Sequence, residues 1–234
     1  MPQRLRCEVA EILAHGDQVY SLLLKPEMPA PRFLPGQFLH LALDKYTPGD
    51  FWPDSRIFSI ASSPSERQLL RITYAVKGRF TSRMETELHA GSEVWIKMPY
   101  GEFIVRGDGE VCLLAGGTGV TAFTAFIAGL PAEASQRVHL FYGARRPDLL
   151  IYRPLVEAAA ARYPDLRPVF LVEEGPAPGC LISLMEVDII WRALPEPLSV
   201  IYYLSGPPAM TKALSAGLAE RGVPAAQVCL DAWE

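Results

Sequence analysis

One stretch, residues 111–123, constrains the fold more than any other, and it reads VCLLAGGTGVTAF. Residues 111–115 are apolar or small, too few for a helix, and typical of a buried strand. Gly116, Gly117 and Gly119 follow, and glycine permits the positive φ that a sharp turn requires. Apolar residues then recur at helical spacing. The stretch therefore predicts a strand, a glycine-rich turn and a helix.

A helix that begins after a glycine turn is suited to binding a phosphate group. Its first N–H groups have no partner within the helix, and its N-terminus carries roughly half a positive charge. The alternative is a tight turn with a structural role only, because short glycine motifs have little specificity. The rest of the chain has to distinguish the two.

Composition excludes several classes of protein. The chain has 234 residues, half of them hydrophobic, which is enough for two domains with cores of their own. Its net charge of -4 favours neither nucleic acid nor a membrane surface as a partner. No apolar run approaches the roughly 18 residues of a membrane span, so we expect no membrane insertion and a cytoplasmic location. The four cysteines and four histidines are widely separated, which predicts no metal site.

The first part of the chain, residues 1–105, has the pattern of an antiparallel β-domain. Its apolar runs are short and separated by turn residues such as Pro35-Gly36 and Pro48-Gly49. A short helix is expected at 81–88. This pattern predicts a six-stranded antiparallel barrel. The expected strands are 5–9, 19–24, 38–43, 57–61, 70–76 and 94–98.

The second part, residues 106–234, begins with a linker at 106–110 and alternates strands with longer helical patterns. Such alternation predicts an α/β domain with a parallel sheet, here of five strands. The expected strands are 111–115, 138–142, 167–172, 200–204 and 228–230. The expected helices are 120–130, 152–162, 183–193 and 208–221.

The α/β topology predicts where a ligand would bind. In doubly wound sheets, ligands bind beyond the carboxyl ends of the strands where the strand order reverses, commonly between the first and fourth strands. The turn at 116–121 follows the first strand, and the turn at 205–208 follows the fourth. We therefore expect both turns to line one site. The glycine spacing is not the GxGxxG of common dinucleotide folds, and no acidic residue ends the second strand to hold a ribose.

Five short motifs in order resemble those of the ferredoxin reductase-like flavoprotein superfamily, which includes flavin reductases and the reductase components of oxygenases. The resemblance covers essentially the whole chain. Two motifs belong to the flavin side and three to the nicotinamide side. They are Arg56-Ile57-Phe58-Ser59, Gly78-Arg79-Phe80-Thr81-Ser82, Gly116-Gly117-Thr118-Gly119-Val120-Thr121, Tyr142-Gly143-Ala144-Arg145 and Ser205-Gly206-Pro207-Pro208-Ala209-Met210.

The resemblance implies that the barrel binds FAD. Arg56 would contact the diphosphate, Phe58 would stack beside the isoalloxazine, and Ser59 would place its hydroxyl near flavin N5. Backbone N–H groups at 78–82 would meet the pyrophosphate. Ile57, Tyr74, Ala75 and Val76 would line the flavin. Each of these residues is also compatible with a purely structural role.

The resemblance also implies that the α/β domain binds NADH or NADPH. Its three motifs, including Gly143, Arg145 and Met210, would hold the nucleotide, and Ser205 would stand beside the nicotinamide. Many relatives have cysteine at the position of Ser205 and proline at that of Ala122. A C-terminal aromatic commonly covers the flavin in this family, and Trp233 is the ring available here.

The resulting prediction is an FAD-containing NAD(P)H oxidoreductase. It would take a hydride onto FAD and pass electrons to ferredoxin, free flavin or a partner protein. The alternatives are an electron-transfer subunit of a larger oxygenase or dehydrogenase, and a regulatory module that binds nucleotide without turnover. We expect a preference for NADH because Glu173 and Glu174 stand where NADP-dependent relatives tend to place Ser-Arg. Arg145 and Arg146 are the cations that would oppose this preference.

Overall fold

The computed structural model describes residues 1–106, 109–131 and 136–231. The chain forms two compact units, Met1–Ile104 and Val105–Glu234. Trp233 lies outside the described residues, so its predicted place against the flavin stays a prediction.

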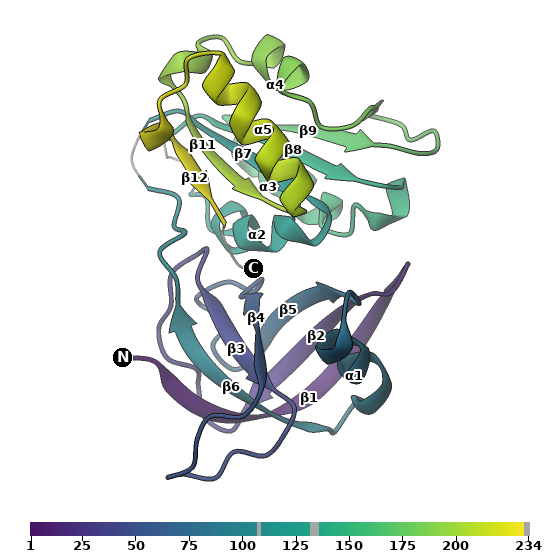
Figure 1. Cartoon of the computed structure of the whole chain (residues 1–234), viewed down its shortest axis with the longest axis vertical. Coiled ribbons are helices and arrows are strands. Elements are labelled where there is room, and N and C mark those ends of the chain that lie inside the picture. Colours follow the sequence, from purple (N-terminus) through teal and green to yellow (C-terminus); the bar gives the residue numbers. More distant parts are fainter. Residues whose placement is uncertain (107–108, 132–135, 232–234) are drawn as a thin grey trace. The chain divides into compact units, whose positions relative to one another are not determined.

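The first unit is a six-stranded antiparallel sheet that curls into a barrel (Figure 1). Its strand order is β4-β3-β6-β1-β2-β5, which confirms the predicted fold class. A single helix, α1 (Arg79–Glu87), follows β5. The strands are β1 (Gln3–Gly16), β2 (Val19–Pro26), β3 (Phe38–Ala42), β4 (Ser55–Ser59), β5 (Leu70–Ala75) and β6 (Glu93–Tyr100).

Apolar side chains at alternate strand positions fill the barrel. Leu39 and Leu41 of β3 point into the core with Leu70 and Ile72 of β5, as period-two patterning requires. Phe80 and Met84 of α1 pack against the same core. The helix is therefore attached to the barrel by its apolar side.

The barrel closes incompletely between its two edge strands, β4 and β5. Just beyond β4, the backbone N–H of Ala61 donates to the carbonyl of Arg71 in β5 at 2.8 Å. The Arg71 N–H donates in turn to the Ser62 hydroxyl at 3.1 Å. Along the strands themselves, β4 pairs with β3 and β5 pairs with β2. The predicted flavin motif, Arg56-Ile57-Phe58-Ser59, lies along this seam between β4 and β5.

The second unit is a parallel sheet with helices on both faces (Figure 1). Its strand order is β10-β9-β8-β7-β11-β12, so the order reverses between β7 and β11 as expected. The strands are β7 (Val111–Gly116), β8 (Val138–Ala144), β9 (Leu166–Val172), β10 (Cys180–Ile182), β11 (Ile201–Ser205) and β12 (Val228–Leu230). The α-helices are α2 (Thr121–Ala128), α3 (Arg153–Arg162), α4 (Val187–Ala193) and α5 (Pro208–Glu220).

The structure corrects the predicted elements of this unit in two places. The sheet has six strands rather than five, because Cys180–Ile182 pairs with Phe170–Val172 of β9. The helix expected at 183–193 begins only at Val187, because the Ser183 N–H donates to the Val172 carbonyl and keeps the chain extended. The glycines at 117 and 119 belong to a 3-10 turn, Gly117–Val120, that leads into α2.

Both faces of the parallel sheet are covered. Ile190 of α4 and Leu214 and Leu218 of α5 pack on one face against Cys112 and Leu114 of β7. Helices α2 and α3 pack against each other on the other face. Such double coverage explains why all six residues of β7 are buried. In the described part of the chain, no helix has the length and apolar character needed to cross a membrane.

A buried carboxyl group ends the last strand of the sheet. The Asp231 N–H donates to the Leu204 carbonyl at 2.9 Å. The Ser205 hydroxyl donates to Asp231 Oδ2 at 2.7 Å. Among the described residues, Asp231 Oδ1 is buried without a hydrogen-bond partner. Burial raises the pKa of Asp231 from 3.8 to about 6, and the Ser205 hydrogen bond opposes that rise.

This raised pKa predicts a pH-dependent stability. The folded protein binds the Asp231 proton more tightly than the unfolded chain does, so stability should fall as the pH rises from 3.8 to about 6. Asp231→Asn keeps an acceptor for Ser205 but does not titrate. Between pH 3.8 and about 6, the free energy of unfolding of wild type should fall by up to about 3 kcal/mol more than that of Asp231→Asn. Urea denaturation at a series of pH values measures this difference. If the free energies of unfolding of the two proteins changed in parallel with pH, the assigned pKa of Asp231 would be wrong.

Candidate functional site

Arg56 lies on edge strand β4, with its guanidinium close to the start of α1. Its side chain is 56% exposed. Its Nη1 donates to Asp54 Oδ1 at 3.0 Å and to the Ser55 carbonyl at 2.8 Å. The guanidinium carbon stands 5.4 Å from the ring centroid of Phe80, the second residue of α1. The structure thus brings two predicted flavin residues from separate motifs together.

A second pair of predicted residues spans the seam of the barrel. The rings of Phe58 in β4 and Tyr74 in β5 meet edge to face, with centroids 6.0 Å apart. Tyr74 is almost fully buried and also stacks on Tyr20 at 5.7 Å. Its ring is therefore part of the barrel core as well as of the seam. The other predicted flavin-lining residues are half-buried on the same two edges: Ile57, Ser59, Ala75 and Val76.

The beginning of α1 is open to a ligand. A Cβ added to Gly78 would meet nothing within 4 Å. The Thr81 hydroxyl accepts from the N–H groups of Lys77 and Gly78, at 2.9 and 3.1 Å. Arg79 and Ser82 are exposed beside it. This is an accessible helix N-terminus with a nearby guanidinium, an arrangement suited to a diphosphate.

In the second unit, the two turns at the reversal of strand order interlock. A Cβ on Gly119 would lie 2.4 Å from the Ser205 carbonyl oxygen. A Cβ on Gly206 would lie 2.9 Å from the Gly116 nitrogen, and one on Gly116 would lie 2.6 Å from Met210 Sδ and 2.9 Å from Pro207 Cδ. These glycines are needed so that the turns can touch each other. The two turns therefore lie beside each other, as expected, and they are in close contact.

Gly117 differs from its neighbours because its missing side chain would enter open space. Its φ is +54°, and an added Cβ would meet nothing within 4 Å. Val120 is buried behind the turn, and the Thr121 hydroxyl donates to the Thr118 carbonyl at 2.8 Å. The backbone at Gly117 is thus the part of the turn that a phosphate could approach closely.

Three other predicted nucleotide residues are packed within the protein: Ser205 and Tyr142 are buried, and Gly143 is half-buried. The Ser205 hydroxyl donates to Asp231, so its hydrogen is already used within the protein. Tyr142 is fully buried, and its hydroxyl donates to the Leu149 carbonyl at 3.3 Å. Gly143 is the last residue of β8 that pairs with β7, where it lies opposite Gly116. A Cβ added to Gly143 would lie 3.2 Å from Met185 Cε.

The charged segments after β8 and β9 are paired with each other. The Glu173 and Glu174 N–H groups both donate to the Arg145 carbonyl, at 3.2 and 2.9 Å. Arg145 Nε lies 3.7 Å from Glu174 Oε1. Arg146 makes two contacts with Asp148, at 3.1 and 2.7 Å. Both arginines that could attract a 2′-phosphate therefore already have carboxylate partners.

Two functional candidates were missed by sequence reasoning. Asp231 follows a three-residue strand, and its contact with Ser205 depends on β12 pairing beside β11. Asp54 is close to Arg56 in sequence, but only the side-chain geometry shows the ion pair. A carboxylate directly after the last expected strand, 228–230, was the available signal for Asp231.

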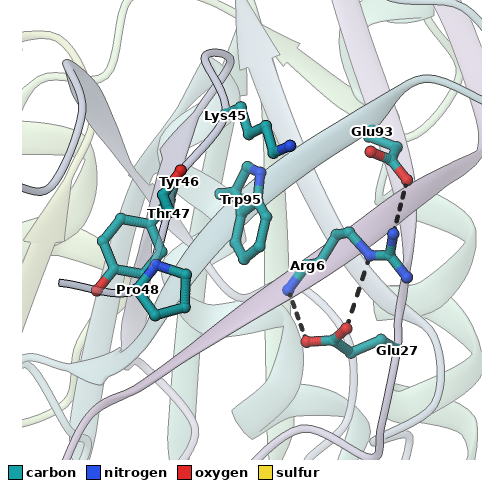
Figure 2. A pocket seen from close by; sticks show the side chains of 8 residues that line it. All are labelled: Arg6, Glu27, Lys45, Tyr46, Thr47, Pro48, Glu93 and Trp95. Carbon is teal, nitrogen blue, oxygen red and sulfur yellow. Dashed lines mark hydrogen bonds and ion pairs between the residues drawn. The ribbon is translucent and has the colours of Figure 1, made fainter. Parts of the chain in front are cut away.

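A hollow of about 410 Å³ lies elsewhere on the first unit (Figure 2). Arg6 stands between two glutamates there and is paired with both, at 3.0 Å from Glu93 and 3.6 Å from Glu27. It contains none of the predicted site residues, and Arg6, Glu27 and Glu93 in its lining are paired with one another. We therefore do not assign the site to this hollow. It is lined by Arg6, Glu27, Lys45, Tyr46, Thr47, Pro48, Glu93 and Trp95.

Comparison with known proteins relates both units to one group. Residues 113–216 match the family model of the oxidoreductase NAD-binding domain. The chain is 30% identical over 205 residues to the ferredoxin–NAD(P)(+) reductase component of naphthalene 1,2-dioxygenase/salicylate 5-hydroxylase systems from a Ralstonia species, covering 86% of this chain and 60% of that protein. It is 29% identical to the reductase component of propane 2-monooxygenase from Rhodococcus jostii, covering 98% and 63%.

The fold agrees with these likenesses. The crystal structure of the Amycolatopsis cytochrome P450 reductase GcoB superposes with a TM-score of 0.85 at 23% identity, over 99% of this chain and 70% of that one. The chain spans about three fifths of the length of the two reductase components. The second unit carries the oxidoreductase NAD-binding domain over residues 113–216, and the chain across both units is similar in sequence to reductase components of oxygenase systems.

Proposed function

We propose that this chain is an FAD-containing NAD(P)H oxidoreductase that takes a hydride from NADH and delivers electrons to an external acceptor. The observation that carries the proposal is the contrast among the glycines. Gly78 and Gly117 leave open space where a phosphate would sit, whereas Gly116, Gly119 and Gly206 are filled by neighbouring turns. Among the glycines of the predicted binding motifs, one in each unit is open, as two phosphate-bearing ligands would require; the other open glycines, Gly49, Gly91, Gly109 and Gly222, lie outside those motifs.

The first unit would hold FAD. Arg56 supplies a cation to the diphosphate, and the N–H groups at the start of α1 supply donors. Phe58 and Tyr74 provide an apolar wall along the seam between β4 and β5. When bound, FAD supplies the hydride acceptor and the donor of electrons to the next carrier.

The second unit would hold the nicotinamide nucleotide. Gly117 lets the pyrophosphate approach the backbone, and Ser205 lies at the carboxyl end of β11, where the strand order reverses. The Asp231 contact fixes the Ser205 hydroxyl. The chain's task is to orient the two ligands and exclude water, and hydride transfer requires no general base from the protein.

The electron acceptor is proposed by class. The relatives named above are reductase components of oxygenase systems, so ferredoxin or a partner protein is the leading acceptor and free flavin the next. The alternative of a subunit in a larger oxygenase or dehydrogenase predicts the same site. All four cysteines are free thiols, which fits a reducing compartment such as the cytoplasm.

Loss of the Arg56 guanidinium should weaken FAD binding selectively. A charge-assisted hydrogen bond is worth about 1.5–3 kcal/mol, so Arg56→Ala should raise the FAD dissociation constant about 10- to 100-fold. NADH-driven reduction of ferricyanide should then depend on added FAD. Titration of apoprotein with FAD measures the affinity, and thermal melting of the apoprotein should be unchanged.

Arg6→Ala is the matched control. Arg6 is a similarly exposed arginine of the same unit that is also paired with carboxylates. It should leave FAD affinity within about twofold of wild type, because an exposed ion pair contributes little. Full flavin retention by Arg56→Ala would show that Arg56 does not hold the diphosphate. A wild-type protein that binds no FAD would overturn the proposed function itself.

The nucleotide preference should be for NADH, by about tenfold in kcat/KM. Glu173 and Glu174 would repel the 2′-phosphate of NADPH, and Arg145 is occupied by Glu174. The double variant Glu173→Ser, Glu174→Arg should shift the ratio toward NADPH. Steady-state kinetics with both nucleotides measures the ratio.

Glu220→Arg controls for long-range charge effects, since it adds two positive units, against three in the double variant, at the far end of α5. It should leave the ratio unchanged. If wild type prefers NADPH, or the double variant does not move, the acidic pair is not the selector.

A further inference from the structure

Arg83 of α1 ties the helix to the connection between β3 and β4. Its Nη2 and Nη1 donate to the two carboxylate oxygens of Asp44, at 2.9 and 3.2 Å. Its Nε and Nη2 also donate to Glu87, one turn later in the helix, at 2.8 and 3.0 Å. The side chain is only 28% exposed. The Arg83 hydrogen bond lowers the pKa of Asp44, so the carboxylate is charged at neutral pH.

The same face of α1 contacts the other end of that connection. Phe80 precedes Arg83 by three residues, so both side chains lie on one side of the helix. Phe80 meets the guanidinium of Arg56, at the start of β4. Asp44 lies just beyond the end of β3. The β3–β4 connection is therefore attached to α1 at both ends, through Asp44 and through Arg56.

Two contacts fix the helix more tightly than one. Packing of Phe80 and Met84 in the barrel core, with the hydrogen bond from the Tyr20 hydroxyl to Glu85 Oε1 at 2.9 Å, holds the body of α1 on the barrel, and the Arg56–Phe80 contact connects it to β4. A bidentate arginine–carboxylate pair adds a defined direction and distance. Because α1 has only nine residues, its own backbone gives little rigidity, and tertiary contacts must place its N-terminus.

We propose that the Arg83–Asp44 ion pair is a positioning contact that sets the N-terminus of α1 against Arg56, so that both reach the same diphosphate. The inference rests on the proposed binding of FAD. A ligand site requires its donors within about half an ångström of their working positions. Arg83 itself is a positioning residue and touches no phosphate.

A merely structural role makes a different prediction. Asp44 is exposed, and ion pairs of this kind contribute little to global stability. If Arg83 only stabilised α1, its pair with Glu87 would matter as much as its pair with Asp44. The positioning role requires that only the Asp44 pair affects FAD binding.

The test compares Arg83→Met, Asp44→Asn, their double variant, Arg83→Lys and Glu87→Gln in the full chain. Each apoprotein is titrated with FAD, and its melting temperature is recorded. We expect Arg83→Met and Asp44→Asn each to raise the dissociation constant about five- to tenfold, and the double variant to match the single variants. Arg83→Lys should recover part of the affinity, since lysine holds one oxygen at a time. Glu87→Gln should stay within about twofold of wild type.

The outcomes distinguish the positioning role of the Arg83–Asp44 pair from the proposed binding of FAD. Wild type that binds FAD while Arg83→Met and Asp44→Asn bind it equally well would overturn the positioning role alone. So would additive losses in the double variant, or a loss in Glu87→Gln as large as in Asp44→Asn. Wild type that binds no FAD would instead overturn the proposed function.

Discussion

The contact between the turns after β7 and β11 is the constraint on which the second unit depends. The two turns are so close that a Cβ at Gly119 would overlap the Ser205 carbonyl, and one at Gly206 would crowd the Gly116 backbone. This contact is possible only because the sheet order places β7 beside β11. With the inner glycines filled by protein, Gly117 is left facing open space. Packing and ligand access are thus divided among neighbouring glycines of one motif.

The first unit depends on an imperfect closure. A fully paired barrel would leave no free strand edge, but here β4 pairs with β3 and β5 with β2, and the Ala61–Arg71 hydrogen bond joins the two edges just beyond β4. The ring pair Phe58–Tyr74 and the helix α1 occupy the region around the remaining seam. The residues proposed to hold FAD come from both edges of this seam and from α1. The unpaired edge is therefore available to the proposed ligand site, since no further strand covers it.

Sequence patterns predicted both sheets, the order reversal and the two adjacent turns, because strand and helix periodicities are local. They missed β10, since three residues after a Pro- and Gly-containing loop carry no periodicity, and its pairing with β9 is a tertiary contact. They also could not show that Ser205 donates to Asp231 or that Arg145 is paired with Glu174. Those contacts depend on which loop ends meet in space. The motif that defined Arg56 gave no sign of Arg83 and Asp44, which lie 39 residues apart.

The central claim is that this one chain binds FAD and a nicotinamide nucleotide and passes a hydride from the nucleotide to the flavin. Anaerobic titration of the FAD-reconstituted protein with NADH, followed by the visible absorption of the flavin, tests it most directly. The account predicts that one equivalent of NADH bleaches one equivalent of bound flavin, and that an oxidised acceptor restores the colour. A flavin that binds but keeps its oxidised spectrum under excess NADH and NADPH would contradict it.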